Sequence, residues 1–159
     1  MLKYRALTSA ELLELENEFK QFLIVHEIYD AEWRELATKN PQKAQEFIDL
    51  FSNIVLEKVY TQLTGLLHIG LDFMTVFDFQ DKVWTLYHFQ TNTADLFTQC
   101  TPDNFITIIQ NSWSELRLQT GTKKSSEQKA QEVHTLISKG AVPLHQTILK
   151  DFLNLLRAN

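Results

Sequence analysis

The chain has 159 residues, of which 44% are hydrophobic and 22% charged, with a net charge of −5. This composition excludes an intrinsically disordered or fibrous protein, and the length predicts a single domain over residues 1–159 with a substantial core. The charge is −4 over residues 1–60, −3 over residues 61–100 and +2 over residues 101–159. Because phosphate backbones bind clustered Lys and Arg, the net negative charge of residues 1–100 disfavours nucleic acid as a partner.

The sequence predicts a cytoplasmic protein. Cys100 is the only cysteine, so no intramolecular disulfide can form, as is usual in a reducing compartment. The first residues lack the apolar run of a secretory signal. No window reaches the roughly 18–20 consecutive apolar residues that a membrane span needs, so we expect no membrane segment.

The first 40 residues predict two helices. Thr8 and Glu11 are spaced as in a capping box, in which the Thr hydroxyl accepts from a helix N–H and the Glu side chain returns the bond. Apolar residues at helical spacing follow, which predicts a helix over residues 9–25. Asp30 is a suitable N-cap for a second, shorter helix.

A third helix is predicted from Pro41 to Leu63. Asn40 suits the cap position, and proline suits the first helical turn. Apolar residues nearly encircle this helix, so we expect it to be central and buried on most sides, with Phe51 and Val55 almost fully buried.

A β-hairpin is predicted over residues 71–90, where the apolar period changes to two. Its strands are separated by the polar turn at residues 80–82. The second strand is apolar on both faces. Trp84 and Leu86 point to one side of it, and Val83, Tyr87 and Phe89 point to the other. Either the C-terminal helices cover that second face, or it is an exposed aromatic patch that a partner can use.

Residues 91–119 are ambiguous. The run from Phe105 to Ile109 suits one face of a helix, but its β-branched residues suit a strand equally well. Alternation of apolar and polar residues from Leu116 is consistent with a strand that ends near Thr120.

Two helices are predicted in the C-terminal part, after a polar loop at residues 121–126. Gly140 ends the first of them, and Pro143 separates it from the last. Helices, then strands, then helices indicate an α+β fold: N-terminal helices, a central antiparallel sheet built on the hairpin, and C-terminal helices.

Several motifs in this order resemble an uncharacterised family of small bacterial proteins of about 160 residues. The motifs are Lys3-Tyr4-Arg5-x-Leu7-Thr8, Glu11-Leu12-x-x-Leu15-Glu16-x-Glu18-Phe19, Trp33, Pro41, Ala44, Phe51-Ser52, Gly121-Thr122-Lys123 and Gly140-Ala141. The resemblance implies a single intracellular domain of unknown function and supplies no catalytic residues.

The polar loop is the best candidate for a binding site. A flexible glycine and two lysines before a helix that begins near Ser125 would suit a phosphate or carboxylate. The candidate anion-binding residues are Gly121, Thr122, Lys123, Lys124 and Ser125. The loop lacks the first glycine of a Walker motif, and the simpler interpretation is a solvated, capped loop.

The other reactive side chains carry weaker hypotheses. Cys100 is either a small buried hydrophobe or a nucleophile at a possible helix start. The five histidines lack metal-ligand spacing, and Asp78 and Asp81 flank a turn. No dinucleotide or phosphate fingerprint is present, so we expect no cofactor and no metal.

Two classes of function remain. Because no catalytic constellation stands out, we favour a non-catalytic interaction module, which binds a second copy or another protein through the aromatic surface near the hairpin at residues 71–90. The alternative is a binding protein or enzyme that uses the loop from Gly121 to Ser126 for an anionic small molecule.

Overall fold

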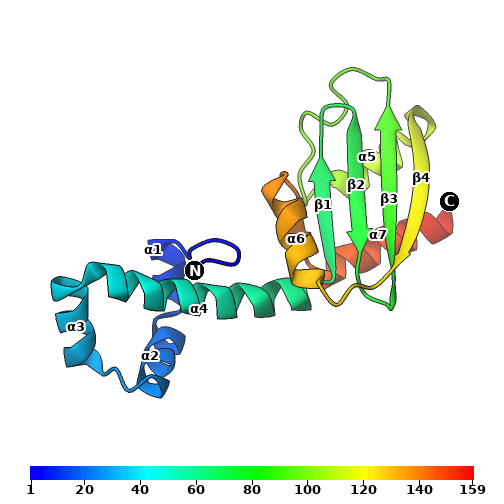
Figure 1. The fold of residues 1–159 in the computed structure, drawn as a ribbon. Helices are drawn as coiled ribbons and strands as arrows, with labels where there is room; N and C mark the ends of the chain where they lie inside the picture. Colours follow the sequence, from blue (N-terminus) through cyan, green and yellow to red (C-terminus); the bar gives the residue numbers. More distant parts are fainter. The chain divides into compact units, whose positions relative to one another are not determined.

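In chain order, helices come first and last and the strands of an antiparallel sheet fall mostly between them in the computed structural model, which describes residues 1–159 (Figure 1). The predicted α+β class is therefore confirmed. Contacts divide the chain into two compact units, Met1–Val59 and Tyr60–Asn159, and each is described by itself below. The prediction of a single domain stays a prediction.

The N-terminal helices begin where the sequence predicts. They are α1 (Ser9–Glu14), α2 (Glu16–Val25), α3 (Asp30–Lys39) and α4 (Pro41–Gln62). The helix expected over residues 9–25 is divided in two, because Leu15 leaves the helical conformation, with φ −101° and ψ 23°. The expected start at Pro41 is confirmed. α3 begins at Asp30, but its N-cap is Tyr29 and no side chain caps it, so the expectation that Asp30 is the N-cap is wrong.

The capping box that precedes α1 is extended by an arginine. The backbone N–H of Glu11 donates to the Thr8 hydroxyl at 3.2 Å, and the Thr8 N–H donates to the Glu11 carboxylate at 2.8 Å. The Arg5 guanidinium donates to both carboxylate oxygens of Glu11, each at 2.8 Å. Hydrogen bonds from Arg5 and from the Thr8 backbone lower the pKa of Glu11 to about 2.

The segment before α1 is attached to α4 by side chains. The Lys3 ammonium and the Tyr4 hydroxyl both donate to the carboxylate of Glu57. The Leu7 N–H donates to the fully buried hydroxyl of Ser52 at 3.0 Å, which satisfies a backbone group that has no helical partner. The N-terminal motif that resembles the family, Lys3-Tyr4-Arg5-x-Leu7-Thr8, thus attaches the start of the chain to α4.

The apolar side of α4 is buried over only part of its circumference. Phe51 is 4% exposed, and its ring centroid lies 5.0 Å from that of Phe19 and 5.3 Å from that of Phe22. Leu50 and Ile54 are 44% and 52% exposed, so the expectation of burial on most sides is wrong. Val55 is half-buried, so the expectation that it is almost fully buried is wrong as well. An encircling apolar pattern needs partners on every side, and α1–α3 supply them on one.

Five antiparallel strands form one sheet in the second unit. They are β1 (Gly65–Ile69), β2 (Phe73–Asp78), β3 (Val83–Thr91), β4 (Leu116–Lys124) and β5 (Val142–Leu144), in the spatial order β4-β3-β2-β1-β5. The predicted hairpin is β2–β3. β1 was not predicted from the sequence. Leu66 and Leu67 are both fully buried, on opposite faces of the sheet, so no alternation of apolar and polar residues is visible.

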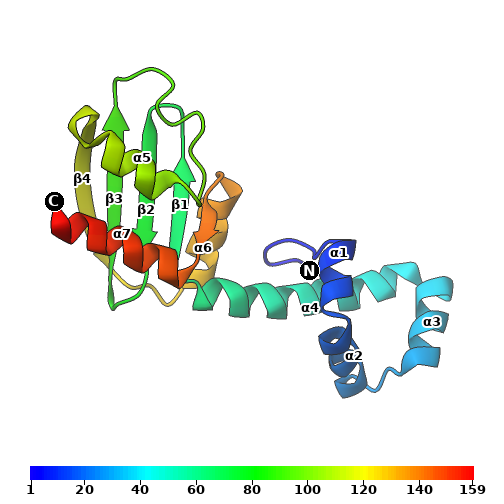
Figure 2. The ribbon, with the colours of Figure 1, turned by 180° about the vertical axis from the view of Figure 1, so that it is seen from behind.

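One face of the sheet carries the main core. The helices of this unit are α5 (Phe105–Asn111), the short 3₁₀ helix η1 (Trp113–Glu115), α6 (Lys129–Ser138) and α7 (Gln146–Ala158). α5 and α7 lie across this face (Figure 2). Met74, Val76 and Phe89 of the sheet pack there with Phe105 and Phe152. We call this the inner face.

The helix alternative for residues 105–109 is therefore correct, and the two predicted C-terminal helices are confirmed. The strand expected to end near Thr120 continues to Lys124, because β4 remains paired with β3 as far as Val83. None of the helices combines the length and apolarity needed to cross a membrane.

Candidate functional site

The opposite face of the sheet, which we call the outer face, is covered only in part. Cross-strand pairing aligns Leu66, Phe77, Leu86 and Gly121 in one row over β1, β2, β3 and β4. Leu66 is fully buried, whereas Phe77 and Leu86 are half-buried. The second face of β3 is thus neither wholly covered nor wholly free.

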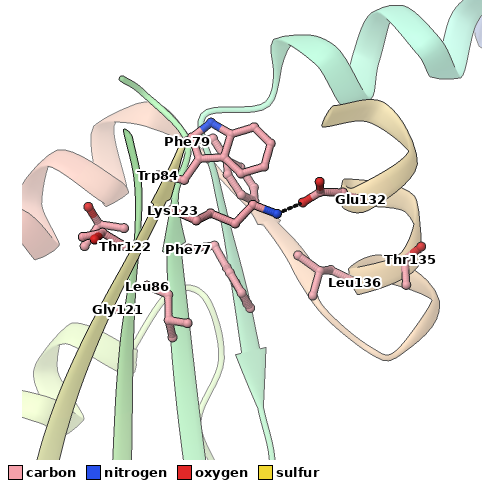
Figure 3. Close-up of a pocket in the computed structure, with 11 residues that line it drawn as sticks. Phe77, Phe79, Trp84, Leu86, Gly121, Thr122, Lys123, Glu132, Thr135 and Leu136 are labelled. Atoms are coloured by element: carbon pink, nitrogen blue, oxygen red, sulfur yellow. Dashed lines mark hydrogen bonds and ion pairs between the residues drawn. The ribbon is translucent and has the colours of Figure 1, made fainter. Parts of the chain in front are cut away.

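A cavity of about 440 Å³ lies on the outer face, between the sheet and α6. Its apolar wall consists of Phe77, Phe79, Trp84, Leu86 and Leu136 (Figure 3). We call this cavity the trough.

A second hollow of about 400 Å³ adjoins the trough along β3 and β4. The two hollows share Phe77, Leu86 and Gly121, and the second extends to His88 and Gln119. The exposed outer face therefore forms one elongated depression.

An ion pair crosses one end of the trough. The Lys123 ammonium lies 2.7 Å from the Glu132 carboxylate on α6, and 5.4 Å from the centre of the Trp84 ring (Figure 3). The two charges compensate each other, so the trough has no net charge from its lining. Both side chains are partly exposed, and such surface pairs contribute little to stability, so this contact can open at small cost.

Gly121 leaves space in the floor of the trough. Its φ is outside the left-handed region, so the backbone does not require glycine. A Cβ added there would lie 3.7 Å from Cδ2 of Leu86, which is ordinary van der Waals contact. A side chain at position 121 would therefore fit and would occupy volume that is now open.

The polar loop predicted to bind an anion is part of β4. Gly121 to Lys124 pair with β3, and α6 begins only at Lys129. The expected helix start at Ser125 is therefore wrong. The Ser125 N–H donates to the Lys82 carbonyl at 2.7 Å and is already satisfied.

The candidate anion-binding residues are also divided between two faces. Neighbouring residues of a strand point to opposite sides, so Lys123 lies on the outer face and Lys124 on the inner face. Figure 3 shows the Thr122 side chain on the far side of β4 from Lys123. The structure instead brings Gly121 and Lys123 together with the hairpin aromatics. The anion site itself stays a prediction.

Asp78 and Asp81 line a different cavity, of about 660 Å³, beside α7. Lys150 and Arg157 line it too, but no two of these charged groups lie within 4.0 Å of each other. Asp78 accepts from the Gln80 N–H at 2.9 Å, as expected of a turn residue. This cavity is polar, and most of its charged side chains are exposed to solvent.

The histidines of the sheet make local contacts. Nδ1 of His88 and the hydroxyl of Thr75 are 2.8 Å apart, and the His88 ring stacks on Phe73 at 5.6 Å. His88 thus pairs with Thr75 and not with an aspartate. No three His, Cys, Asp or Glu side chains in residues 1–159 are grouped so that they could hold a metal ion.

Cys100 is half-buried against the main core, and burial raises the pKa of its thiol to about 11. The thiolate is the nucleophilic form, so this environment favours the small-hydrophobe interpretation.

We expect iodoacetamide to alkylate Cys100 about a hundredfold more slowly in the folded protein than in urea at pH 8. The thiolate fraction is about 0.1% for a pKa of about 11 and about 10% for the ordinary pKa near 9. The folded-state rate should continue to rise up to about pH 11. Mass spectrometry of timed samples measures both rates, and equal rates at pH 8 would show that the thiol is accessible and ionised.

Two side chains of the trough, Leu136 and Glu132, were not predicted from the sequence. Leu136 falls within the predicted helix that Gly140 ends, but nothing in the sequence pattern shows that it faces Phe77. The pair between Lys123 and Glu132 joins a strand to a helix, so no fixed spacing reveals it.

Comparison with known proteins agrees with the predicted resemblance to an uncharacterised family. The model of a family described as "Family of unknown function (DUF6495)" matches residues 1–157, which include both compact units. Searches of curated proteins and of solved structures found no match.

Proposed function

The chain belongs to this family of unknown function, so its role has to be argued from its own residues, and we propose that it is a non-catalytic binding module for an elongated apolar small molecule. The observation that supports the proposal is the trough: about 440 Å³, walled by five large apolar side chains. Small-molecule sites have volumes of roughly 300–1,000 Å³ and mostly apolar linings with few polar groups.

The charges of the trough favour a neutral apolar ligand over an anion. Lys123 is already paired with Glu132 at 2.7 Å, so an anionic ligand would have to displace that carboxylate. An apolar ligand gains instead by removing Phe77 and Leu86 from water, and it leaves the ion pair intact. The hollow that continues toward His88 gives space for an elongated molecule.

We propose the cytoplasm as the place where this module works. A single cysteine with no disulfide partner is typical of proteins in a reducing compartment.

Two matched probes test the proposal: N-phenyl-1-naphthylamine, which is neutral, and its 8-sulfonate, which is anionic. We expect the neutral probe to bind the full chain with an increase in its fluorescence and with quenching of Trp84, which lines the trough. Gly121→Leu fills the space beside Leu86 and should weaken binding by about tenfold or more, since one bulky side chain removes most of the contact area.

The matched control is Lys124→Leu, which places the same side chain three residues further along β4, on the inner face and outside the lining of both hollows. It should leave probe affinity unchanged, and circular dichroism should show that both variants are folded. Failure of the neutral probe to bind, or equal weakening by both variants, would overturn the proposal. Selective binding of the sulfonate, lost in Lys123→Met, would support the anionic-ligand alternative instead.

A further inference from the structure

The two edges of the sheet are unequal. The β5 edge has three residues with Pro143 at its centre, and a proline cannot donate a backbone hydrogen bond to an added strand. The β4 edge has nine residues from Leu116 to Lys124, without proline, and seven of them are exposed. Long exposed edges are templates for pairing with another strand, and most proteins protect them.

The pairing with β3 shows which backbone groups of β4 face outward. The Ser125 N–H donates to the Lys82 carbonyl, so residues 117, 119, 121 and 123 direct their N–H and C=O groups to β3. Residues 118, 120, 122 and 124 therefore direct theirs to the open edge. These eight groups can form a second ladder without any change in β3–β4 pairing.

The charge of this edge is one-sided. Arg117, Lys123 and Lys124 are its only charged residues, and neither Arg117 nor Lys124 has an ion-pair partner within 4.0 Å. A second copy that paired in the fully overlapped antiparallel register would place Arg117 opposite Lys123 twice. Like charges in directly opposed positions destabilise a strand pair, so the edge is better suited to a different partner.

We propose that β4 accepts an acidic extended segment of another protein as a sixth, antiparallel strand. One carboxylate of the segment lies opposite Arg117 and another opposite Lys124, seven residues apart. Main-chain hydrogen bonds to residues 118, 120 and 122 supply affinity, and the two carboxylates supply selectivity. The outward-facing N–H and C=O groups of β4 form this surface, which shares Gly121 with the trough, and the inference does not depend on a ligand there.

Gly121 adds a preference at one position of the segment. On the open edge Gly121 belongs to a non-hydrogen-bonded pair, in which opposed side chains are closest. Since Gly121 has no side chain, a large apolar residue opposite it can lie across the strand toward Leu86, 3.7 Å from where a Cβ of residue 121 would be. The segment should therefore carry an aromatic residue three positions after its first acidic residue.

The experiment uses a fluorescein-labelled peptide of sequence ETVFTTVET, titrated with the full chain and followed by fluorescence anisotropy. Thr120→Pro removes an outward-facing N–H and leaves the inward ladder to β3 complete, so the variant should fold. We expect it to weaken peptide binding by about tenfold, as loss of one central hydrogen bond should. Thr120→Val, which keeps the N–H, should bind as the unmodified chain does.

Modified peptides test the same ladder without changing the protein. N-methylation at the third, fifth and seventh residues should abolish binding, whereas N-methylation at the fourth and sixth, which point away from β4, should leave it within about threefold. The charge-reversed peptide KTVFTTVKT should bind weakly to the unmodified chain and tightly to the double variant Arg117→Glu with Lys124→Glu.

Three results would overturn the inference: no binding of ETVFTTVET at millimolar concentration, equal effects of the two N-methylation patterns, or indifference to Thr120→Pro. Analytical ultracentrifugation tests the other occupant. A dimer of the unmodified chain that Thr120→Pro dissociates would show that a second copy occupies β4 and would also reject the acidic segment. Naphthylamine binding should be unchanged in Thr120→Pro, so this outcome is separable from the test of the trough.

Discussion

Phe152→Ala is expected to lower the free energy of unfolding of the C-terminal unit by about 3–5 kcal/mol, the usual cost of removing a buried phenylalanine ring. Phe152 lies on α7 and is fully buried. Its ring centroid is 5.4 Å from Tyr87, 6.1 Å from Phe89 and 5.9 Å from Phe105, so it joins α7 to both β3 and α5. Alanine would leave a cavity at the centre of this aromatic cluster.

Urea denaturation followed by Trp113 fluorescence measures the change, because the Phe89 and Trp113 ring centroids are 6.4 Å apart. The double variant Trp33→Phe with Trp84→Phe makes Trp113 the only tryptophan. Phe152→Leu is the control: it keeps most of the apolar volume and should cost less than half as much. Leu153→Ala, on the same helix at a half-buried position, should also cost less. Equal stability of Phe152→Ala and the unmodified chain would mean that α7 does not pack on the inner face.

Phe51→Ala is expected to cost about 3–5 kcal/mol in the N-terminal unit, for the same reason. Phe51 is 4% exposed and contacts the rings of Phe19 and Phe22, so one side chain joins α4 to α2. Trp33 is a natural reporter, since its ring lies 5.2 Å from that of Phe19. The double variant Trp84→Phe with Trp113→Phe makes Trp33 the only tryptophan.

The matched control is Leu50→Ala, one residue earlier on α4 and 44% exposed, which should change stability much less. A fall equal to that of Phe51→Ala would contradict the assignment of Phe51 to the core. The same variant tests the single-domain prediction. If residues 1–159 unfold as one domain, Phe51→Ala should lower the transition reported by Trp33 in that background and the one reported by Trp113 in Trp33→Phe with Trp84→Phe by the same amount.

Elements with one clear period were predictable. The β2–β3 hairpin has polar residues at its turn and apolar alternation on either side, and Thr8 with Glu11 forms the capping box that their spacing indicated. β1 was not predictable, because two adjacent leucines are buried on opposite faces. The break at Leu15 was also hidden, since its apolar spacing continues through both helices.

The candidate site was predictable in pieces. Trp84 and Leu86 were expected on the second face of the hairpin, and Gly121 and Lys123 in a possible binding segment. Their convergence depends on the register of β3 with β4, which places Leu86 opposite Gly121 and Trp84 opposite Lys123. Register between strands that are separated by 24 residues follows from tertiary packing, and local patterns do not contain it.

The strand order also bears on how the sheet assembles. β1, β2 and β3 are consecutive in the chain and are joined by short turns, so their pairing closes only small loops. β5 pairs with β1 over Gly65↔Leu144 to Leu67↔Val142, after some 70 intervening residues, and only Val142 and Leu144 direct their amides to β1. Refolding should therefore begin at the β2–β3 hairpin and proceed outward, and β5 should be the last strand to pair with the sheet. In native-state hydrogen exchange, the amides of Val142 and Leu144 should be the first of the sheet to lose protection.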